Sequence, residues 1–375
     1  MTASRKSVEL GVFIPVGNGG WITSTTSPQL PATYEYNKAV TLLAEDLGFD
    51  FALSMAKWRG YGGPSQHWDY TLESLTTMSG LAEATSRIGV WGTVHTMIFH
   101  PAVVAKMAAV LDQISGGRFG LNLVAGSNPA DQGQMGLWRD LDHDGRYALA
   151  EEWITVAKRL WTEERVSHEG QFYKLDDCMS NPKPKKAPPI ICAGASDRGF
   201  RFTVRNCTGS FLLGSNRDDF VKTGLRAKEI AREMGRTDFK TYGLFTIVPA
   251  ATDKEAQERV DYYNSGVDVI ALDNQTREYS SDPSLKQNTM ANRFIDQGNQ
   301  RNSMSQAAVI GSPETIAEKL AYIIKNADLD GMTVIVPDFI ADLRTTGTEV
   351  VAGLQAAGVM TNAFAHQHGG SHARH

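Results

Sequence analysis

The sequence is poor in cysteine: its 375 residues include only three, Cys178, Cys192 and Cys207. An odd number of cysteines without metal-ligand spacing is typical of reduced thiols rather than of a disulfide framework. No apolar run approaches the roughly 20 residues that a membrane-spanning helix requires. The first residues also lack the apolar core and cleavage site of a secretory signal. We therefore expect a cytoplasmic protein that does not associate with membranes.

Positive charge is also limited. Lysine and arginine number 37 against 42 aspartate and glutamate residues, which gives a formal net charge of −5. Without a basic stripe, a nucleic-acid partner is not expected. Hydrophobic residues make up 42% of the chain and charged residues 21%, a composition typical of a well-packed globular enzyme. A small molecule is therefore the expected partner.

Several common catalytic motifs are missing as well. The chain contains no G-x-x-x-x-G-K-[ST], no H-E-x-x-H and no G-x-S-x-G, which argues against a P-loop, a zinc protease and a nucleophile elbow. His67, His95, His100, His143 and His168 are scattered without a ligand-like i, i+4 partner. The sequence thus favours a phosphate-bearing organic cofactor over a metal or a side-chain nucleophile.

Strand and helix patterns alternate through most of the chain. Strands are predicted at Val8–Pro15, Phe49–Ser54, Ile88–Thr96, Arg118–Ala125, Pro189–Ala193, Ser210–Gly214, Thr241–Val248 and Met332–Pro337. Helices are predicted at Thr33–Leu47, Thr71–Thr85, Val103–Ile114, Tyr147–Thr162, Gly199–Asn206, Asp218–Met234, Lys254–Tyr263 and Pro313–Asn326. Eight alternations with nearly continuous apolar strands favour a closed (β/α)8 TIM barrel. A doubly wound sheet is the alternative, but residues 15–20 do not form its G-x-G-x-x-G turn.

Three segments are longer than ordinary barrel loops. Residues 17–31 follow the first strand, residues 126–145 follow the fourth, and residues 264–306 precede the last helix and strand. The third segment is rich in Asn, Gln, Ser and Asp, so we expect a lid or a mobile surface excursion. Without an internal repeat or linker, we expect a single domain with its core at residues 8–360 and a disordered tail at 361–375.

One polar residue interrupts an otherwise apolar strand. Asn122 lies in the middle of the predicted strand Arg118–Ala125, which follows a turn at Gly116 and Gly117. Burying its amide without a partner would cost roughly 1–3 kcal/mol. In parallel α/β folds, ligands bind at the carboxyl ends of the strands. We therefore expect a polar ligand to meet Asn122.

Other polar residues gather at predicted strand ends. Thr93 and His95 end the third strand, and the stretch from Ser54 to Gly60 follows the second. Gly194-Ala195-Ser196 is a small-residue turn that opens a helix, where free N–H groups favour a phosphate. A plain turn with a helix cap is the alternative. Arg146 and Tyr147 open another helix and could form a second phosphate clamp, or be a surface arginine and a packed tyrosine.

Six stretches in chain order resemble one known family. They are GVFIPVGNGGW from Gly11, FDFALSMAKWRGYGG from Phe49, TSRIGVWGTVHT from Thr85, ISGGRFGLNLVAG from Ile114, GRYALAEEW from Gly145 and ICAGASDRG from Ile191. They resemble the bacterial luciferase-like flavin monooxygenases, and within them most closely the flavin-dependent pyrimidine monooxygenases of uracil degradation. The similarity runs from about Val8 to Ala357 and is densest before residue 200.

The resemblance implies a (β/α)8 barrel that uses reduced FMN, supplied by a separate NAD(P)H-dependent flavin reductase, with O2 as co-substrate. It implies oxygenation of an N-heterocyclic substrate with C–N bond cleavage, and a homodimer or homotetramer. It places a set of residues at the flavin: Met55, Ala56, Lys57, Thr93, Asn122, Asp131, Arg146, Tyr147, Gly194, Ala195 and Ser196. Of these, Arg146, Tyr147 and Ser196 would meet the phosphate region, and Thr93 would lie near the reactive face.

The sequence departs from the pyrimidine enzymes where the substrate would bind. After the fourth strand, the family's Gly-Trp-Gln-Lys-Pro-Glu is replaced by residues 126–131, GSNPAD. Asp131 is one methylene shorter than the family's flavin-contacting glutamate, and Ser127 replaces the tryptophan, which opens space. His95 replaces a smaller residue and can donate or accept a proton near neutral pH. We expect Trp58, His95 and Ser127 at the substrate, and Thr93, Asn122 and His95 as catalytic residues.

Several functions remain open at this stage. The substrate could be pyrimidine-like or a larger heteroaromatic such as a flavin-like molecule, while a sulfone, a sulfonate or a halogenated aromatic is a further alternative. An F420-dependent oxidoreductase would transfer hydride without oxygen, since that cofactor is used elsewhere in the same superfamily. A flavin-binding relative without catalysis is a third possibility.

Overall fold

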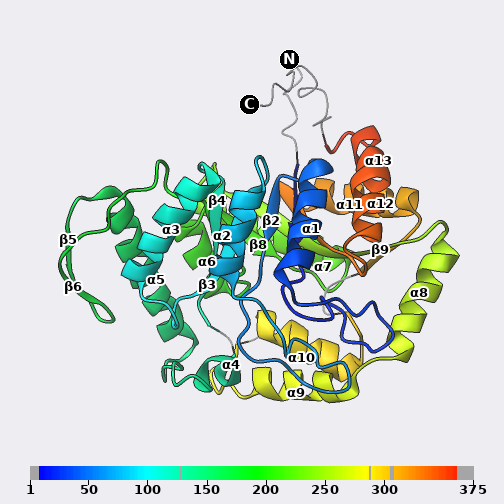
Figure 1. Cartoon of the computed structure of the whole chain (residues 1–375), viewed down its shortest axis with the longest axis horizontal. Coiled ribbons are helices and arrows are strands. Elements are labelled where there is room, and N and C mark those ends of the chain that lie inside the picture. Colours follow the sequence, from blue (N-terminus) through cyan, green and yellow to red (C-terminus); the bar gives the residue numbers. More distant parts are fainter. Residues whose placement is uncertain (1–7, 127, 287–288, 305–307, 361–375) are drawn as a thin grey trace.

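Eight parallel strands close into a barrel at the centre of the molecule (Figure 1). The computed structural model describes residues 8–126, 128–286, 289–304 and 308–360. Around the ring the strands are β1 (Glu9–Phe13), β2 (Phe51–Leu53), β3 (Gly89–His95), β4 (Phe119–Val124), β7 (Ile190–Cys192), β8 (Gly209–Leu212), β9 (Lys240–Pro249) and β11 (Gly331–Ile335). β11 pairs in parallel with both β9 and β1 and so closes the ring. The predicted TIM barrel is confirmed.

Helices lie between these strands and cover the barrel. They are α1 (Tyr34–Asp46), α2 (Ser74–Ala84), α3 (Pro101–Ser115), α5 (His143–Thr162), α6 (Asp197–Asn206), α7 (Arg217–Glu233), α8 (Asp253–Ser265) and α11 (Pro313–Asn326). α12 (Ala341–Thr345), the π-helix η1 (Thr346–Val350) and α13 (Val351–Ala356) follow β11. All eight predicted helices are present, with ends that differ by a few residues. Within the described ranges, none of the helices has the length and apolar character needed to cross a membrane.

The barrel interior shows why particular residues occupy these strands. A side chain at Gly11 of β1 would place its Cβ 2.2 Å from the ring of Phe51 on β2, so only glycine fits there. Outside the barrel, Ser312 caps α11 by accepting a hydrogen bond from the N–H of Thr315 at 3.3 Å. Pro313 occupies the first turn, where the missing N–H costs nothing.

Three strands were missed by the sequence analysis. β5 (Val166–Glu169) and β6 (Lys174–Cys178) form an antiparallel hairpin outside the barrel, and most of their residues are exposed or half-buried. Their polar character hides the alternation that identifies a strand. β10 (Ala308–Gly311) pairs with residues 246–249 of β9 and extends the sheet beyond the ring.

The long segments form a cap over the carboxyl ends of the strands. The cap consists of residues 17–31, of residues 128–145 with α4 (Pro129–Gly133), and of the described parts of residues 264–304 with α9 (Val269–Ser280) and α10 (Met290–Gln300). Figure 1 shows α4, α9 and α10 together at one end of the molecule. Isolated β-bridges join Ile22 to Met304 and Ser24 to Val267.

The third segment differs from the excursion that its composition suggested. It contains two helices, and α9 begins at the N-cap Asp268, whose Oδ1 accepts from the N–H of Ala271 at 3.0 Å. Polar residues on both helices obscure the helical period in the sequence. The predicted disordered tail, residues 361–375, lies outside the described residues.

Candidate functional site

A large cavity lies between the barrel and the cap. Its volume is about 1380 Å³ when the open solvent at its mouth is included. Its walls come from the carboxyl ends of the barrel strands, from the first turn of α5, from the β7–α6 turn, and from α4, α9 and α10. This is where a (β/α)8 barrel places its active site.

At the barrel end of the cavity, Thr93 and Asn122 face each other across β3 and β4. They are paired in register, and the Asn122 Nδ2 donates to the Thr93 hydroxyl oxygen at 3.0 Å. That hydroxyl in turn donates to the Ser54 carbonyl oxygen at 2.5 Å. The Asn122 Oδ1 is buried without a hydrogen-bond partner. The amide that interrupted an apolar strand is therefore paired through its nitrogen only, which leaves an acceptor for a ligand.

Another part of the cavity wall is formed by two helix starts, those of α5 and α6. Ser196 caps α6 by accepting from the Gly199 N–H at 3.1 Å, and its Oγ lies 3.2 Å from the Nε2 of His143 on α5. Tyr147 reaches the same turn: a Cβ on Gly199 would lie only 2.5 Å from its hydroxyl oxygen. Burial raises the pKa of Tyr147, so its hydroxyl stays protonated and can donate. His143, which the sequence analysis left without a role, belongs to this group.

Arg146 lies in this part of the wall too, but its guanidinium already has partners. Its Nη2 is 2.5 Å from the Asp282 Oδ2, and its Nη1 donates to the Ser284 Oγ at 3.1 Å and the Leu141 carbonyl oxygen at 2.9 Å. Both Arg146 and Asp282 are buried and line the cavity. In the protein alone, Arg146 thus forms an ion pair that ties the first turn of α5 to the α9–α10 connection, and its contact with a phosphate stays a prediction.

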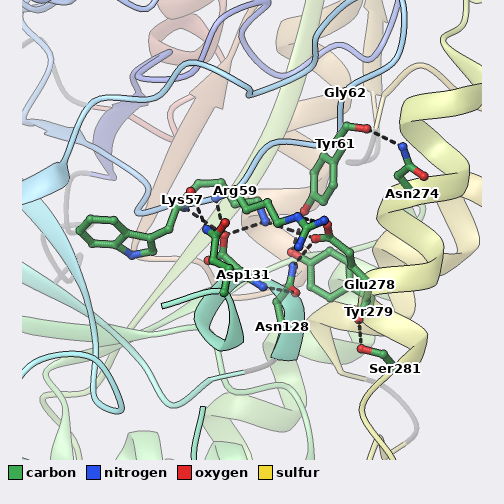
Figure 2. A network of polar contacts seen from close by, with 12 residues as sticks. Lys57, Arg59, Tyr61, Gly62, Asn128, Asp131, Asn274, Glu278, Tyr279 and Ser281 are labelled. Carbon is green, nitrogen blue, oxygen red and sulfur yellow. Dashed lines mark hydrogen bonds and ion pairs between the residues drawn. The ribbon is translucent and has the colours of Figure 1, made fainter. Parts of the chain in front are cut away.

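A second buried ion pair joins the β2 loop to the cap (Figure 2). The Lys57 Nζ lies 3.0 Å from the Asp131 Oδ1 and 3.6 Å from the Glu278 Oε2 on α9. The same Asp131 oxygen accepts from the backbone N–H groups of Trp58 at 3.0 Å and Arg59 at 2.8 Å. The residue expected to touch the flavin thus fixes the β2 loop with one of its carboxylate oxygens.

The network continues from this ion pair along α9, as Figure 2 shows. Asn274 donates to the Tyr61 carbonyl oxygen at 2.9 Å, and Asn128 donates to the Glu278 Oε2 at 3.2 Å. The Tyr61 and Tyr279 hydroxyl oxygens lie 3.4 Å apart. Burial raises the pKa of both phenols, so they are neutral at physiological pH. Polar contacts therefore hold the cap to the barrel at several points.

His95 contacts a glutamine that the sequence analysis did not single out. The Gln132 Nε2 on α4 lies 3.0 Å from the His95 Nδ1, and both residues line the cavity. Burial, opposed by Asp131 and aided by the charge of Lys57, lowers the pKa of His95 to about 4. His95 is therefore a neutral imidazole at pH 7. No sequence pattern identified Gln132, because a glutamine in a short helix is ordinary.

Aromatic side chains form another wall of the cavity. The Trp21 and Trp68 rings meet edge to face at 5.3 Å. Their indole N–H groups donate to backbone carbonyl oxygens, Trp21 to Phe13 at 3.2 Å and Trp68 to Gly20 at 2.6 Å. Trp68 has a φ of +59°, which is strained for a bulky residue. A Cβ on Gly17 would lie 2.6 Å from the Trp68 ring, so this wall requires glycine at position 17.

The structure brings most of the predicted site residues together. Lining the cavity are Met55, Ala56, Lys57, Thr93, His95, Asn122, Asp131, Arg146, Tyr147, Gly194, Ala195 and Ser196. Trp58 is not among the described residues of the wall, and its ring lies 6.2 Å from that of Phe99. Ser127 lies outside the described residues. The sequence analysis missed the contribution of α9, α10 and the connection between them, including Tyr279, Asp282 and Phe294.

The cysteines and the acidic residues do not add a metal centre in the part of the chain that the structure describes. There, no three His, Cys, Asp or Glu side chains are grouped so that they could hold an ion. Cys192 lines the cavity, and burial raises the pKa of its thiol. The thiol is therefore protonated at neutral pH and a poor nucleophile.

Comparison with known sequences gives two consistent results. The family model described as luciferase-like monooxygenase matches residues 8–329. A pyrimidine monooxygenase, RutA from Escherichia coli O150:H5 (strain SE15), is 37% identical over 350 residues, which cover 92% of this chain and 91% of the relative.

Solved structures with the same fold are more distant in sequence. A riboflavin lyase (RcaE), solved with modified FMN and its substrate riboflavin, has a TM-score of 0.83 and 20% identity, covering 94% of this chain and 92% of that chain. EDTA monooxygenase (EmoA) from Chelativorans sp. BNC1 has a TM-score of 0.77 and 21% identity, covering 94% of this chain and 95% of that one.

Proposed function

The chain belongs to the luciferase-like monooxygenase family, and from this premise we propose that it is a two-component monooxygenase that uses reduced FMN and O2 on an N-heterocyclic substrate. The reduced flavin would come from a separate NAD(P)H-dependent flavin reductase. Membership of the family makes the chain an oxidoreductase of the monooxygenase type. The choice of FMN, of the reductase and of the substrate is our proposal.

The two ends of the cavity suit the two ends of FMN. The observation that carries the proposal is the buried Asn122 Oδ1, which has no partner in the protein and could accept from an N–H of the flavin ring. At the other end, the start of α6 offers free N–H groups and a positive helix end to a phosphate. His143, Tyr147 and Ser196 stand beside that helix start. Met55, Ala56 and Lys57 would lie along the ring.

The chain's own residues would bind and orient the cofactor and substrate. Reduced FMN, when bound, supplies the two electrons that divide O2 into one oxygen atom for the substrate and one for water. The Thr93 hydroxyl is held by Ser54 and Asn122 at fixed distances, which gives a preorganised polar group beside the ring. The cap helices line the cavity and would limit the access of bulk water to the reacting atoms.

A planar ring is the substrate shape that the aromatic wall favours. Trp21 and Trp68 satisfy their indole N–H groups within the protein, so they present apolar ring surfaces to a ligand. Such surfaces stack on aromatic and heteroaromatic rings. The 37% identical relative is named a pyrimidine monooxygenase, which agrees with a pyrimidine-like or larger heteroaromatic substrate and with C–N bond cleavage.

Oxygen uptake with a substrate panel tests the proposal. Purified protein supplied with FMN, NADH and a flavin reductase should convert a member of the panel to an oxygenated product in step with oxygen consumption. The panel contains uracil, the fused pyrimidine lumazine, a dialkyl sulfone and a halogenated phenol. If all the oxygen is recovered as hydrogen peroxide, the substrate class is wrong. Turnover under anaerobic conditions with reduced F420 would instead show a hydride-transfer enzyme.

Replacing Asn122 with alanine should weaken FMN binding. The variant loses a buried acceptor for the flavin, and a hydrogen bond of this kind is worth about 1 kcal/mol, or roughly a fivefold to tenfold change in the dissociation constant. Titration of FMN fluorescence measures it. Asn326→Ala on the exposed face of α11 is the matched control. Unchanged FMN affinity in Asn122→Ala would remove Asn122 from the cofactor site.

We also propose that the protein is a homodimer or homotetramer. Val103, Met107, Val110 and Ile114 form an exposed apolar stripe along α3, with 38–49% of each side chain accessible. Their spacing of three and four residues places them on one face of the helix. Contiguous exposed apolar surface of this kind marks an interaction site. Sedimentation at micromolar concentration should give a mass two or four times that of the 41.0 kDa chain. A monomer would contradict this proposal.

A further inference from the structure

The contact between His95 and Gln132 places two polar side chains side by side in the cavity wall. His95 ends β3 and is 8% exposed, and Gln132 on α4 is 1% exposed. The Gln132 Nε2 lies 3.0 Å from the His95 Nδ1. Thr93 and His95 are two residues apart on β3, so both project from the same side of the strand toward the cavity. The pair therefore belongs to the same chamber as the proposed flavin site.

The contact decides which nitrogen of His95 carries the proton. Burial and the nearby charge of Lys57 keep the imidazole neutral, and Asp131 opposes this without reversing it. A neutral imidazole has one N–H and one acceptor nitrogen. Because the Gln132 amide nitrogen can only donate, the Nδ1 accepts and the proton resides on Nε2. The Nε2–H is thus the group that His95 can offer to a ligand.

Gln132 supplies a hydrogen-bond acceptor beside this donor. Its Nε2 donates to His95, and its Oε1 is buried without a hydrogen-bond partner. Leaving such an acceptor unpaired costs about 1–3 kcal/mol, and buried polar groups in proteins are nearly always paired. A ligand N–H would relieve this cost. One donor and one acceptor, both uncharged, therefore stand at this side of the cavity.

We propose that His95 and Gln132 form a recognition pair that selects an uncharged heterocycle carrying both a carbonyl oxygen and an N–H. In this pair, the His95 Nε2–H donates to the carbonyl and the Gln132 Oε1 accepts from the N–H. Gln132 is in addition the positioning residue that sets the His95 tautomer. This role rests on the proposed function, in which the cavity binds the substrate.

The surroundings of the pair disfavour anionic substrates. Asp131 is the residue before Gln132 in α4, and its buried carboxylate is paired with Lys57. The Lys57 ammonium also lies 3.6 Å from Glu278, so its positive charge is already offset by two carboxylates. A carboxylate bound at His95 would meet a neutral imidazole and nearby acidic groups. Orotate, the 6-carboxylate of uracil, should therefore bind more weakly than uracil.

Ligand pairs that differ only in their N–H groups test the proposal without turnover. Calorimetric titration at pH 7 of the protein loaded with oxidised FMN would compare uracil with 1,3-dimethyluracil and lumazine with 1,3-dimethyllumazine. In at least one pair, the N–H member should bind about tenfold to a hundredfold more tightly, as expected for loss of a hydrogen bond at a buried acceptor. Equal affinities within both pairs, or no detectable binding of any of the four compounds, overturn the proposal.

Variants then test whether His95 and Gln132 cause the preference for the N–H compounds. Gln132→Leu should weaken binding of the N–H compound about tenfold to a hundredfold, by as much as the parent protein prefers it. The two members of the pair should then bind with similar affinities, while FMN affinity stays unchanged. His95→Phe should act on both members, because it removes the donor to the carbonyl that they share. Gln257→Leu, on the exposed face of α8, is the matched control. A preference that persists in Gln132→Leu overturns the role of Gln132.

The tautomer of His95 can be observed directly by NMR, and it would not depend on Gln132 if that residue had only a structural role. In protein labelled with 15N-histidine, the His95 signal is identified by its loss in His95→Phe. It should show protonated Nε2 and an accepting Nδ1 at pH 7, and Gln132→Leu should shift the Nδ1 resonance. A proton found on Nδ1 in the parent protein overturns the proposal.

These results separate the inference from the proposed function. If the parent protein prefers the N–H compounds but never oxygenates them with reductase and O2, the recognition pair stands and the monooxygenase assignment on this substrate class fails. If it oxygenates the methylated and unmethylated compounds equally well, the assignment stands and the recognition pair fails.

Discussion

Arg146→Ala is expected to weaken FMN binding about tenfold to a hundredfold while riboflavin binding changes little, because a charge-assisted hydrogen bond is worth roughly 1.5–3 kcal/mol. FMN and riboflavin differ only in the phosphate, and Arg146 lies at the end of the cavity assigned to it. In the protein alone, its guanidinium is paired with Asp282. A phosphate dianion would compete with that carboxylate. Fluorescence titration with both flavins measures the difference.

A substitution of Asp282, the ion-pair partner of Arg146, is expected to change FMN affinity in the opposite direction. Asp282→Asn leaves the guanidinium beside a neutral group of the same size, so FMN affinity should rise severalfold relative to riboflavin. Arg139→Ala removes an exposed cation from the same segment and should change neither affinity. If Arg146→Ala weakens both flavins equally, Arg146 acts as an anchor of the cap rather than as a phosphate ligand.

Asp131→Ala is expected to lower the free energy of unfolding by about 3–5 kcal/mol, the usual cost of removing one partner of a buried ion pair. The Asp131 side chain is 2% exposed and that of Lys57 is 6% exposed, so the change leaves a buried ammonium with only the more distant Glu278, at 3.6 Å, as an ion-pair partner. It also removes the acceptor of the Trp58 and Arg59 backbone N–H groups. Thermal unfolding followed by circular dichroism measures the loss.

Two further variants separate the loss of the ion pair from the loss of the backbone N–H contacts of Asp131. Lys57→Met combined with Asp131→Leu removes both charges and should recover part of the stability, because the stranded ammonium is gone. Asp273→Asn on α9 breaks an exposed pair with Arg301, the residue after α10. Both side chains are nearly half accessible, so the change should cost less than about 1 kcal/mol. A double variant no more stable than Asp131→Ala would show that the backbone N–H contacts dominate.

The barrel could be predicted from the sequence because its strands and helices each carry a local pattern. Apolar runs such as Phe119–Val124 and capped helices such as Pro313–Asn326 are determined by residues close in the chain. The cap could not be predicted in the same way. The helices at Val269–Ser280 and Met290–Gln300 mix polar and buried residues, and they are stabilised by contacts with segments more than 200 residues away, such as Ser24.

The residues of the candidate site also fall into those that the sequence identifies and those that only the fold reveals. Asn122 and Ser196 could be identified because a polar residue in a buried strand and a small-residue helix start are unusual in sequence. Gln132 and Asp282 are ordinary polar residues in polar segments, so only the fold reveals that they are buried beside His95 and Arg146. For the same reason, the partner of Lys57 could not be deduced: the ion pair joins residues 74 positions apart.

The closure of the barrel by β11 bears on the order in which the protein is made. Because β1 pairs with β2 on one side and with β11 (Gly331–Ile335) on the other, the first strand lacks one neighbour until residues 331–335 have been made. The cavity is likewise unfinished before residues 291–294 of α10 have emerged. During synthesis from the N-terminus, Trp21 and Trp68 are therefore made long before the residues of α10 that line the same cavity. A ligand that needs the whole cavity can stabilise the fold only after residue 294 has been made.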